Sequence, residues 1–188
     1  MKRQKVFGVG FHKTGTKSLG SALETLGYRT CGPMWTKEPA IGDTVLERAR
    51  SLVPKYDAFQ DNPWPLLFRE MDADFPDSKF VLTICPSDEW IARCMRFFGT
   101  RNTAMRRWIY GDDAGSPIGN EAAYVARYEA HNHEVQAHFA ERPDQLLVMP
   151  LIAEPRWEPL CAFLGLDVPT GQAFPHKNKN PHGPSNES

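Results

Sequence analysis

The sequence is short of the features that mark specialised classes of protein. Its formal net charge is only −1 over 188 residues, so nothing indicates broad nucleic-acid binding and any cationic site must be local. No apolar run is long enough to span a bilayer, and the basic start, residues 1–5, precedes a stretch too short and glycine-broken for a signal peptide. We therefore expect no nucleic-acid or membrane partner and a cytoplasmic location.

Cysteine is scarce as well. The four cysteines have neither C-x-x-C spacing nor the paired spacing of metal ligands: Cys31, Cys85, Cys94 and Cys161. We expect reduced thiols in a reducing compartment and no metal site. Because 41% of residues are hydrophobic and no repeat or linker divides the chain, we expect one domain over residues 1–179. Residues 180–188 are polar and proline-bearing, which predicts a flexible tail.

A turn near the start carries the strongest signal. Residues 6–10 are short and apolar, as in a buried parallel strand, and residues 11–18 then bring two lysines and three hydroxyls. Apolar residues at helical spacing follow, with Gly27 as a stop: Leu19, Ala22, Leu23 and Leu26. Such a turn points backbone N–H groups and the positive end of a helix at one place. The sequence therefore predicts a site for a phosphate-like group.

Three phosphate-binding patterns compete for this turn. The dinucleotide pattern G-x-G-x-x-G fails, because Lys13 stands where its third glycine is required. The nucleoside-triphosphate pattern G-x-x-x-x-G-K-[ST] fits from Gly10 to Gly15, but Thr16 intrudes before Lys17 and shifts that lysine around the helix. This near match leaves a kinase or nucleotide hydrolase using ATP and magnesium as an alternative.

The third pattern is the phosphosulfate-binding loop of sulfotransferases, which residues 13–19, Lys-Thr-Gly-Thr-Lys-Ser-Leu, resemble without a gap. Further segments resemble that family, so the similarity covers almost the whole chain: 56–63, 75–83, 105–111, 124–135, 157–165 and 174–178. The resemblance is to a compact cytosolic branch. It implies an α/β fold of the P-loop NTPase-like type, with a parallel central sheet of about four to five strands flanked by helices.

The implied activity is sulfonate transfer from 3′-phosphoadenosine 5′-phosphosulfate (PAPS) to a hydroxyl or amine of a small-molecule acceptor, without a metal. By resemblance, Lys13 stabilises charge on the leaving phosphate and is a catalytic residue. The phosphosulfate is held by the residues that follow it: Thr14, Gly15, Thr16, Lys17 and Ser18. Residues 174–179 resemble the terminal motif of the family, in which Lys177 and Lys179 close over the nucleotide.

The acceptor needs a base within hydrogen-bond reach. Asp61 is expected at the carboxyl end of a parallel strand, where α/β sites gather, and is our candidate catalytic base. The alternative is a turn aspartate that caps a helix beginning near Pro65. We interpret His12 as a loop histidine rather than a catalyst, and His131 and His133 as surface or packing residues.

One departure from the family pattern stands out. The third core strand of that family usually ends in an arginine, with a serine one helical stretch later, and the two hold the donor's 3′-phosphate. Here these positions are Cys85 and Arg93, and a thiol cannot form the bidentate contact of a guanidinium. We expect Arg93, or else Arg96, to return the charge to that pocket. The alternative is a non-catalytic sulfotransferase-like binding protein.

Farther on, the sequence predicts a helix over residues 121–140 and a strand over 146–149. Asn120 is expected to cap the helix. Its apolar face is expected to comprise Ala123, Val125, Tyr128, Val135 and Phe139. The acceptor itself and the oligomeric state leave no readable pattern.

Overall fold

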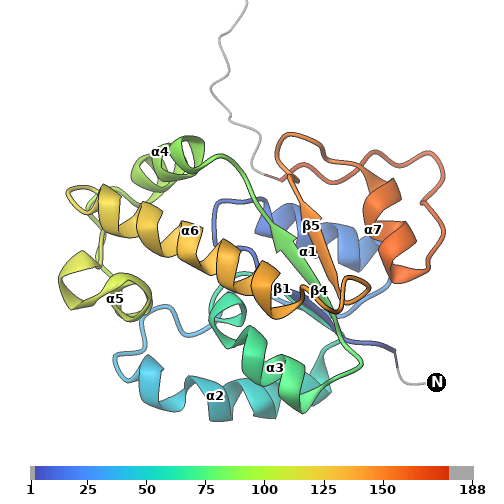
Figure 1. Ribbon diagram of the computed structural model, residues 1–188, viewed down its shortest axis with the longest axis horizontal. Helices are drawn as coiled ribbons and strands as arrows, with labels where there is room; N and C mark the ends of the chain where they lie inside the picture. The colour runs from blue at the N-terminus through green and yellow to red at the C-terminus, as the bar shows by residue number, and fades with distance from the viewer. Residues whose placement is uncertain (1–2, 178–188) are drawn as a thin grey trace, which may run out of the picture.

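Short apolar segments pair into a five-stranded parallel sheet in the computed structural model, which describes residues 3–177 (Figure 1). The strands are β1 (Val6–Gly8), β2 (Thr30–Cys31), β3 (Ala58–Phe59), β4 (Lys79–Thr83) and β5 (Leu146–Met149), in the order β2-β3-β1-β4-β5. The α/β class and the parallel sheet are as the sequence predicts. The two-residue edge strand β2 was not predicted, since two residues leave no periodic pattern.

Helices connect and cover the strands. The α-helices are α1 (Thr16–Thr25), α2 (Ile41–Leu52), α3 (Phe68–Asp74), α4 (Ser87–Phe98), α5 (Ala104–Tyr110), α6 (Glu121–His138) and α7 (Trp157–Leu164). Three 3₁₀ turns lie between them among the described residues: η1 (Val53–Lys55), η2 (Trp64–Leu67) and η3 (Asp112–Ala114). Among residues 3–177, no helix combines the length and apolar character needed to cross a bilayer.

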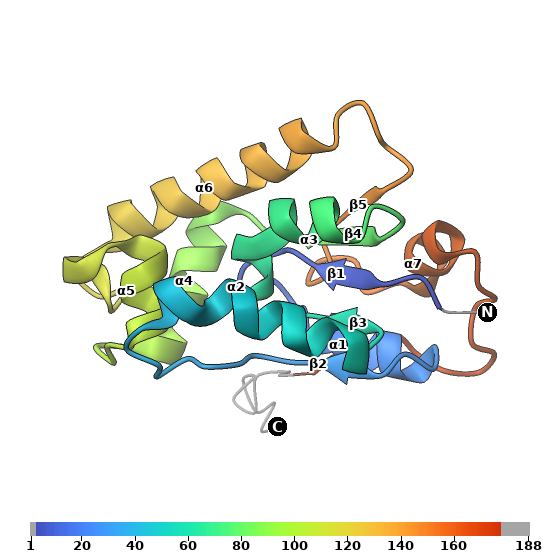
Figure 2. The same cartoon turned by 90° about the horizontal axis from the view of Figure 1, so that it is seen from below.

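The two faces of the sheet differ in the size of their side chains. Parallel register aligns Phe7 with Phe59 and with Phe80, and their rings stack with centroids 4.7 and 5.5 Å apart. This aromatic face packs against the side of the molecule that carries α2, α3 and α6 (Figures 1 and 2). Because side chains alternate along a strand, Val6 and Val81 point the other way, against α1 and α7.

The strand order puts β1 at the point where the chain changes direction across the sheet. From β1 the chain passes through α1 to the edge strand β2, returns at β3, and only then reaches β4 on the other side of β1. A crevice opens beyond the carboxyl ends of the strands at such a switch point. The segment that follows β1, residues 9–15, lies there.

Helix α6 corrects part of the sequence interpretation. It ends at His138 rather than at residue 140, and its buried residues are Tyr124, Tyr128, His131 and Val135. Ala123 is exposed, because the large tyrosine beside it fills the core instead. Asn120 does precede the helix, but its side chain donates to the Ser116 carbonyl at 3.1 Å and does not cap.

The single domain over residues 1–179 stays a prediction. Lys179 and the tail over residues 180–188 lie outside the residues that the structure describes.

Candidate active site

The loop after β1 has a shape that its glycines make possible. Val9 N donates to Val81 O at 2.8 Å, so the loop begins attached to β4. At Gly10 the loop backs onto that strand: a methyl carbon there would lie 2.7 Å from Thr83 N and closer still to its Oγ1 and O. Lys13 (φ 67°) and Gly15 (φ 103°) take left-handed conformations, and Gly15 leads directly into α1. The first N–H groups of α1, which have no acceptor within the helix, therefore face the crevice.

Thr14 holds this loop in place from within. Its hydroxyl donates to Phe11 O at 2.5 Å and lies 2.6 Å from Thr83 Oγ1, and the residue is fully buried. Residues 13–18 are the predicted phosphosulfate loop, and all of them except Thr14 line the cavity in front of it. Its side chain ties the loop to β4, and only its main chain remains to meet a ligand.

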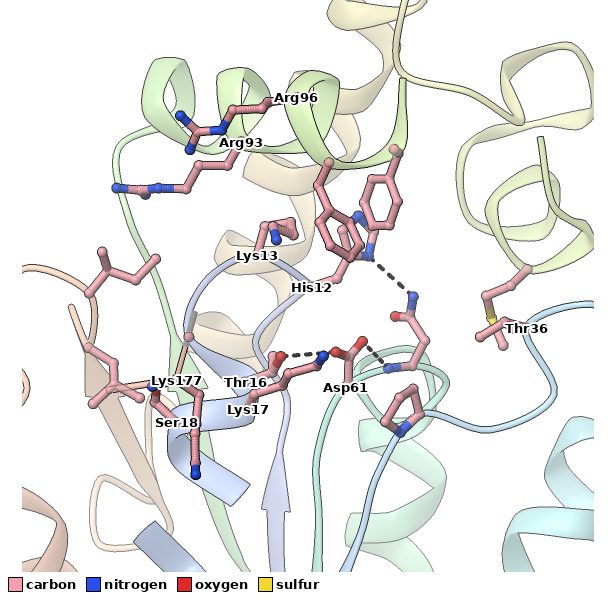
Figure 3. A pocket seen from close by; sticks show the side chains of 18 of the residues that line it. His12, Lys13, Thr16, Lys17, Ser18, Thr36, Asp61, Arg93, Arg96 and Lys177 are labelled. Carbon is pink, nitrogen blue, oxygen red and sulfur yellow. Dashed lines mark hydrogen bonds between the residues drawn. The ribbon is translucent and has the colours of Figure 1, made fainter. Parts of the chain in front are cut away.

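A cavity of about 1150 Å³ opens in front of the loop (Figure 3). Cationic side chains from four parts of the chain line it: Lys13, Lys17, Arg93, Arg96, Arg106 and Lys177. Among the described residues that line it, Asp61 is the only carboxylate. Apolar side chains complete the lining, including Pro33, Phe98 and Met105. The cavity thus offers strong attraction for anions beside a smaller apolar region.

Helix α4 supplies one wall of this cavity. Arg93 Nη2 donates to Glu89 Oε2 at 2.7 Å, while its Nη1 is buried with no hydrogen-bond partner among the described residues. Phe97 lies half exposed, and the Lys13 ammonium rests 3.7 Å from the centre of its ring. Burial lowers the pKa of Lys13. Lys13 is therefore held against an aromatic ring at the cavity, without a carboxylate partner in the described structure.

Asp61 lines the same cavity, with its carboxylate beside Thr16 and the end of the Lys17 side chain (Figure 3). Thr16 Oγ1 donates to Asp61 Oδ2 at 2.9 Å, and Asn62 N donates to Oδ1 at 2.8 Å. Burial raises the pKa of this carboxyl, although both hydrogen bonds and the charges of Lys17 and Lys13 oppose the shift. The carboxylate itself does not cap η2: its hydrogen bonds among the described residues are those to Thr16 and Asn62, and Trp64 N at the start of η2 donates to the Asp61 main-chain oxygen instead.

The end of the described chain returns to the start of α1. Lys177 N donates to Ser18 Oγ at 3.0 Å, and His176 and Lys177 both line the cavity. Residues separated by most of the sequence are thereby brought together. The hydroxyl of Ser18 is used in this contact, while the Lys177 side chain remains at the cavity (Figure 3).

Cys85 and Arg93, the two departures from the family pattern, lie differently. Cys85 is half-buried, and its main chain exchanges two hydrogen bonds with the Tyr128 hydroxyl, at 3.0 and 2.9 Å. It does not line the cavity, whereas Arg93 does. Burial raises the pKa of the Cys85 thiol, so this position brings no charge to the site.

His12 contributes more to the site than the sequence indicated. It is buried and lines the cavity, with Asn62 Nδ2 3.2 Å from Nδ1 and the Tyr110 hydroxyl 3.0 Å from Nε2. Burial, then the charges of Arg106 and Lys13, lower its pKa to about 3. His131 is also buried and bonds Val9 O at 2.7 Å, whereas His133 is exposed, which fits the packing and surface roles expected for them.

No group of three or more histidine, cysteine, aspartate or glutamate residues within residues 3–177 is arranged to hold a metal ion. The charged residues that meet at the cavity instead come from the loop after β1 and the start of α1, from the turn after β3, from α4, from α5 and from the end of the described chain.

Comparison with models of protein families identifies the family of this chain. The family model described as a sulfotransferase domain matches residues 5–114 and 99–182. The chain belongs to the sulfotransferase family. Comparison with curated proteins gave no significant match.

Several residues of this sulfotransferase-family site escaped sequence reasoning. Asn62, Arg106 and the segment after β5 with Leu151, Ile152 and Pro155 all line the cavity. Asn62 had a usable signal, since it follows the candidate base at the carboxyl end of a strand. Arg106 and residues 151–155 had none, because only tertiary packing brings α5 and that segment to the loop.

Proposed function

We propose that this protein transfers a sulfonate group from PAPS to a hydroxyl or amine of a small molecule. One observation supports it above all: the amino end of α1, with Lys13 and Lys17, shares a cavity with Arg93 and Lys177. The donor carries a phosphosulfate and a separate 3′-phosphate, and two groups of cations suit two separated anions. The apolar part of the cavity provides room for an acceptor beside them.

The loop would hold the phosphosulfate. Backbone N–H groups at the start of α1 and the positive end of the helix favour an anion there. The Thr16 hydroxyl and the Lys17 ammonium line the same cavity, and Gly15 lets the main chain approach closely. Thr14 would contribute through its N–H group, since its hydroxyl already donates to Phe11 O, whereas Ser18 Oγ only accepts from Lys177 N and keeps its own proton for the anion.

Lys13 would stabilise the charge that develops on the leaving phosphate. Its contact with Phe97 is a weak restraint: a cation over an exposed ring gains about 0.5–1 kcal/mol, and a hydrogen bond to a charged group about 1.5–3 kcal/mol. An anion in the loop would therefore draw the ammonium away from the ring. A cation that matters most in the transition state raises kcat itself.

Asp61 would accept the proton that the acceptor loses. Its carboxylate lines the cavity and is fixed by Thr16. Burial raises its pKa, which makes the carboxylate a stronger base than an exposed aspartate. Thr16 lies at the start of α1 and bonds Asp61, so it would fix the position of the base relative to the phosphosulfate donor.

The 3′-phosphate would bind on the side of α4 and Lys177. Arg93 Nη1 is buried and has no hydrogen-bond partner among the described residues, and a guanidinium nitrogen in that state fits an anionic ligand. Arg93 and Arg96 would supply from the helix the charge that Cys85 lacks. Lys177, beside Ser18, would act from the opposite side.

Calorimetric titration tests the donor. We expect 3′-phosphoadenosine 5′-phosphate, the desulfated product, to bind without added metal, and to bind about tenfold or more tightly than 5′-AMP, which lacks the 3′-phosphate. ATP with magnesium is the matched competitor. Tighter binding of ATP with magnesium than of the product would contradict the proposal and favour a kinase or hydrolase.

A non-catalytic binding protein is the second candidate, because Cys85 brings no charge to the site. It predicts that the desulfated product binds but that no acceptor from a broad panel of alcohols, phenols and amines receives labelled sulfonate from PAPS. Transfer that depends on Lys13 would exclude it.

A further inference from the structure

The amide of Asn62 is arranged asymmetrically at the cavity. Only 6% of Asn62 is exposed, yet the residue lines the cavity immediately after Asp61. Its Nδ2 faces His12 Nδ1 at 3.2 Å. Its Oδ1 is buried and has no hydrogen-bond partner within the described residues. Leaving a buried amide oxygen without a partner is costly, so such atoms usually meet a ligand or water.

His12 determines which way this amide points. With its pKa lowered to about 3, the ring is neutral at pH 7 and carries one N–H and one lone pair. When Nδ1 accepts from Asn62 Nδ2, the proton lies on Nε2 and is directed at the Tyr110 hydroxyl, 3.0 Å away. The carbonyl oxygen of Asn62 then necessarily points away from His12.

We propose that Asn62 Oδ1 and the Asp61 carboxylate act as a pair of hydrogen-bond acceptors that selects a primary amine as the sulfonate acceptor. This rests on the function proposed above and narrows its acceptor. One nitrogen of a primary amine brings two hydrogens and satisfies both acceptors. A lone hydroxyl brings one, so it leaves one of the two unpaired.

The charges around the pair act on the amine in opposite directions. Lys13, Lys17 and Arg106 line the same cavity and lower the pKa of an ammonium, whereas the Asp61 carboxylate raises it. We therefore confine the inference to amines that are uncharged at pH 7, such as arylamines, which bind with the lone pair available. As that nitrogen forms its bond to sulfur, the bond from sulfur to the 5′-phosphate oxygen breaks, and one N–H proton passes to Asp61. The products are a sulfamate and the desulfated nucleotide, and no oxidant or metal is consumed.

The rest of the acceptor would lie against the apolar lining. Pro33, Phe98 and Met105 line the cavity with Asn62, and Phe98 also packs edge-on against the His12 ring. An aromatic primary amine matches both features, and simple anilines make useful probes because they are uncharged at pH 7.

Binding of aniline, N-methylaniline and phenol to the protein, with and without 3′-phosphoadenosine 5′-phosphate, tests the inference. We expect aniline to bind about tenfold more tightly than either competitor, and Asn62→Leu to reduce that preference to about twofold or less while the nucleotide affinity changes less than twofold. Equal binding of the three probes, binding of none of them, or unchanged preference in the variant would overturn it. Failure of the nucleotide to bind would instead overturn the proposed function. The three probes measured without nucleotide would still show whether Asn62 and Asp61 select a primary amine.

A second measurement needs no variant. In a ¹⁵N NMR spectrum of the wild-type protein at pH 7, we expect His12 Nε2 to carry the proton and Nδ1 to have the shift of a bare nitrogen. The opposite tautomer would require Asn62 to present its N–H₂ group to the cavity, which would exclude the acceptor pair.

Discussion

Two walls of the same cavity are built by different means. The loop wall comprises residues 9–18 with Asp61 and Asn62, and its shape is set by main chain: Gly10 against Thr83, Gly15 at the start of α1, and buried hydrogen bonds. The α4 wall comprises residues 93–98, and its chemistry resides in long side chains on one helix. Arg93 and Arg96 hold their charges several bonds from the backbone.

The difference bears on the proposed role of Arg93. A guanidinium can reach a given anion from more than one backbone position, so under the proposed function Arg93 would supply from α4 the charge that Cys85 does not bring. The loop wall allows less exchange, because besides its side chains it relies on main-chain N–H groups whose directions depend on φ and ψ. We therefore expect substitutions in the loop wall to be costly and those in the α4 wall to be graded.

Gly10→Ala should have the largest effect. The added methyl would collide with the main chain of Thr83, so the loop and β4 must separate. We expect a loss of about 3 kcal/mol or more in the free energy of unfolding, measured with urea. Gly32→Ala is the matched control: its methyl would meet only the end of the Gln60 side chain, and it should cost less than about 1 kcal/mol. Similar losses in both would refute the close approach at Gly10.

Lys13→Ala should come next. We expect kcat for sulfonate transfer to fall about 100-fold or more, with the affinity for the desulfated nucleotide reduced much less, because the ammonium acts mainly on charge that develops during reaction. Lys37→Ala changes an exposed lysine away from the cavity lining and serves as the control. Equal kcat in Lys13→Ala and the wild type would remove Lys13 from the mechanism.

His131 on α6 bonds Val9 O of the loop wall, and we expect it to make the stability of the protein depend on pH. Burial lowers its pKa from 6.5 to about 4, so the unfolded chain binds the proton more readily between these values. The stability contribution of the neutral ring is therefore complete above pH 6.5 and is lost as pH falls towards 4.

His131→Gln keeps an N–H group for Val9 O but does not titrate. Between pH 7 and pH 4, the wild type should lose about 2–3 kcal/mol more stability than this variant in urea unfolding. The exposed His133→Gln should show no such difference. Parallel pH profiles of wild type and His131→Gln would contradict the neutral, buried state.

Arg93→Ala tests the α4 wall and should have the smallest effect. We expect about a tenfold loss of affinity for the desulfated nucleotide and little change for 5′-AMP, since the lost contact is to the 3′-phosphate. Glu89→Gln, which releases Arg93 from its ion pair, should leave the affinity equal or higher. An equal loss for both nucleotides would place Arg93 elsewhere in the site.

The sequence predicts the loop wall better than the α4 wall for the same physical reason. A strand, a glycine-bearing turn and a helix are local, so the path from residue 6 to residue 27 was readable, as were β4 and β5. Asp61 followed from the rule that α/β sites gather at strand ends. The neutral state of His12 and the presence of Arg106 depend on contacts between distant segments, which no spacing records.

The buried face of α6 also differs from the face that the sequence predicts. Tyr124, Tyr128, His131 and Val135 recur at helical spacing and are the buried residues, whereas Ala123 lies about 100° from Tyr124 around the helix and is exposed. The core accepts the tyrosine since a large ring fills space that an alanine would leave empty. Its partner Trp90 lies on α4, 34 positions earlier, with ring centroids 6.3 Å apart.

The close packing of Gly10 against Thr83 has a consequence for folding during biosynthesis. Translation makes the loop early and β4 much later, so the nascent chain carries these lysines and glycines with nothing behind them. The loop can take its final course only after Thr83 has left the ribosome and β4 has joined β1. The loop is thus synthesised well before the strand that fixes its course.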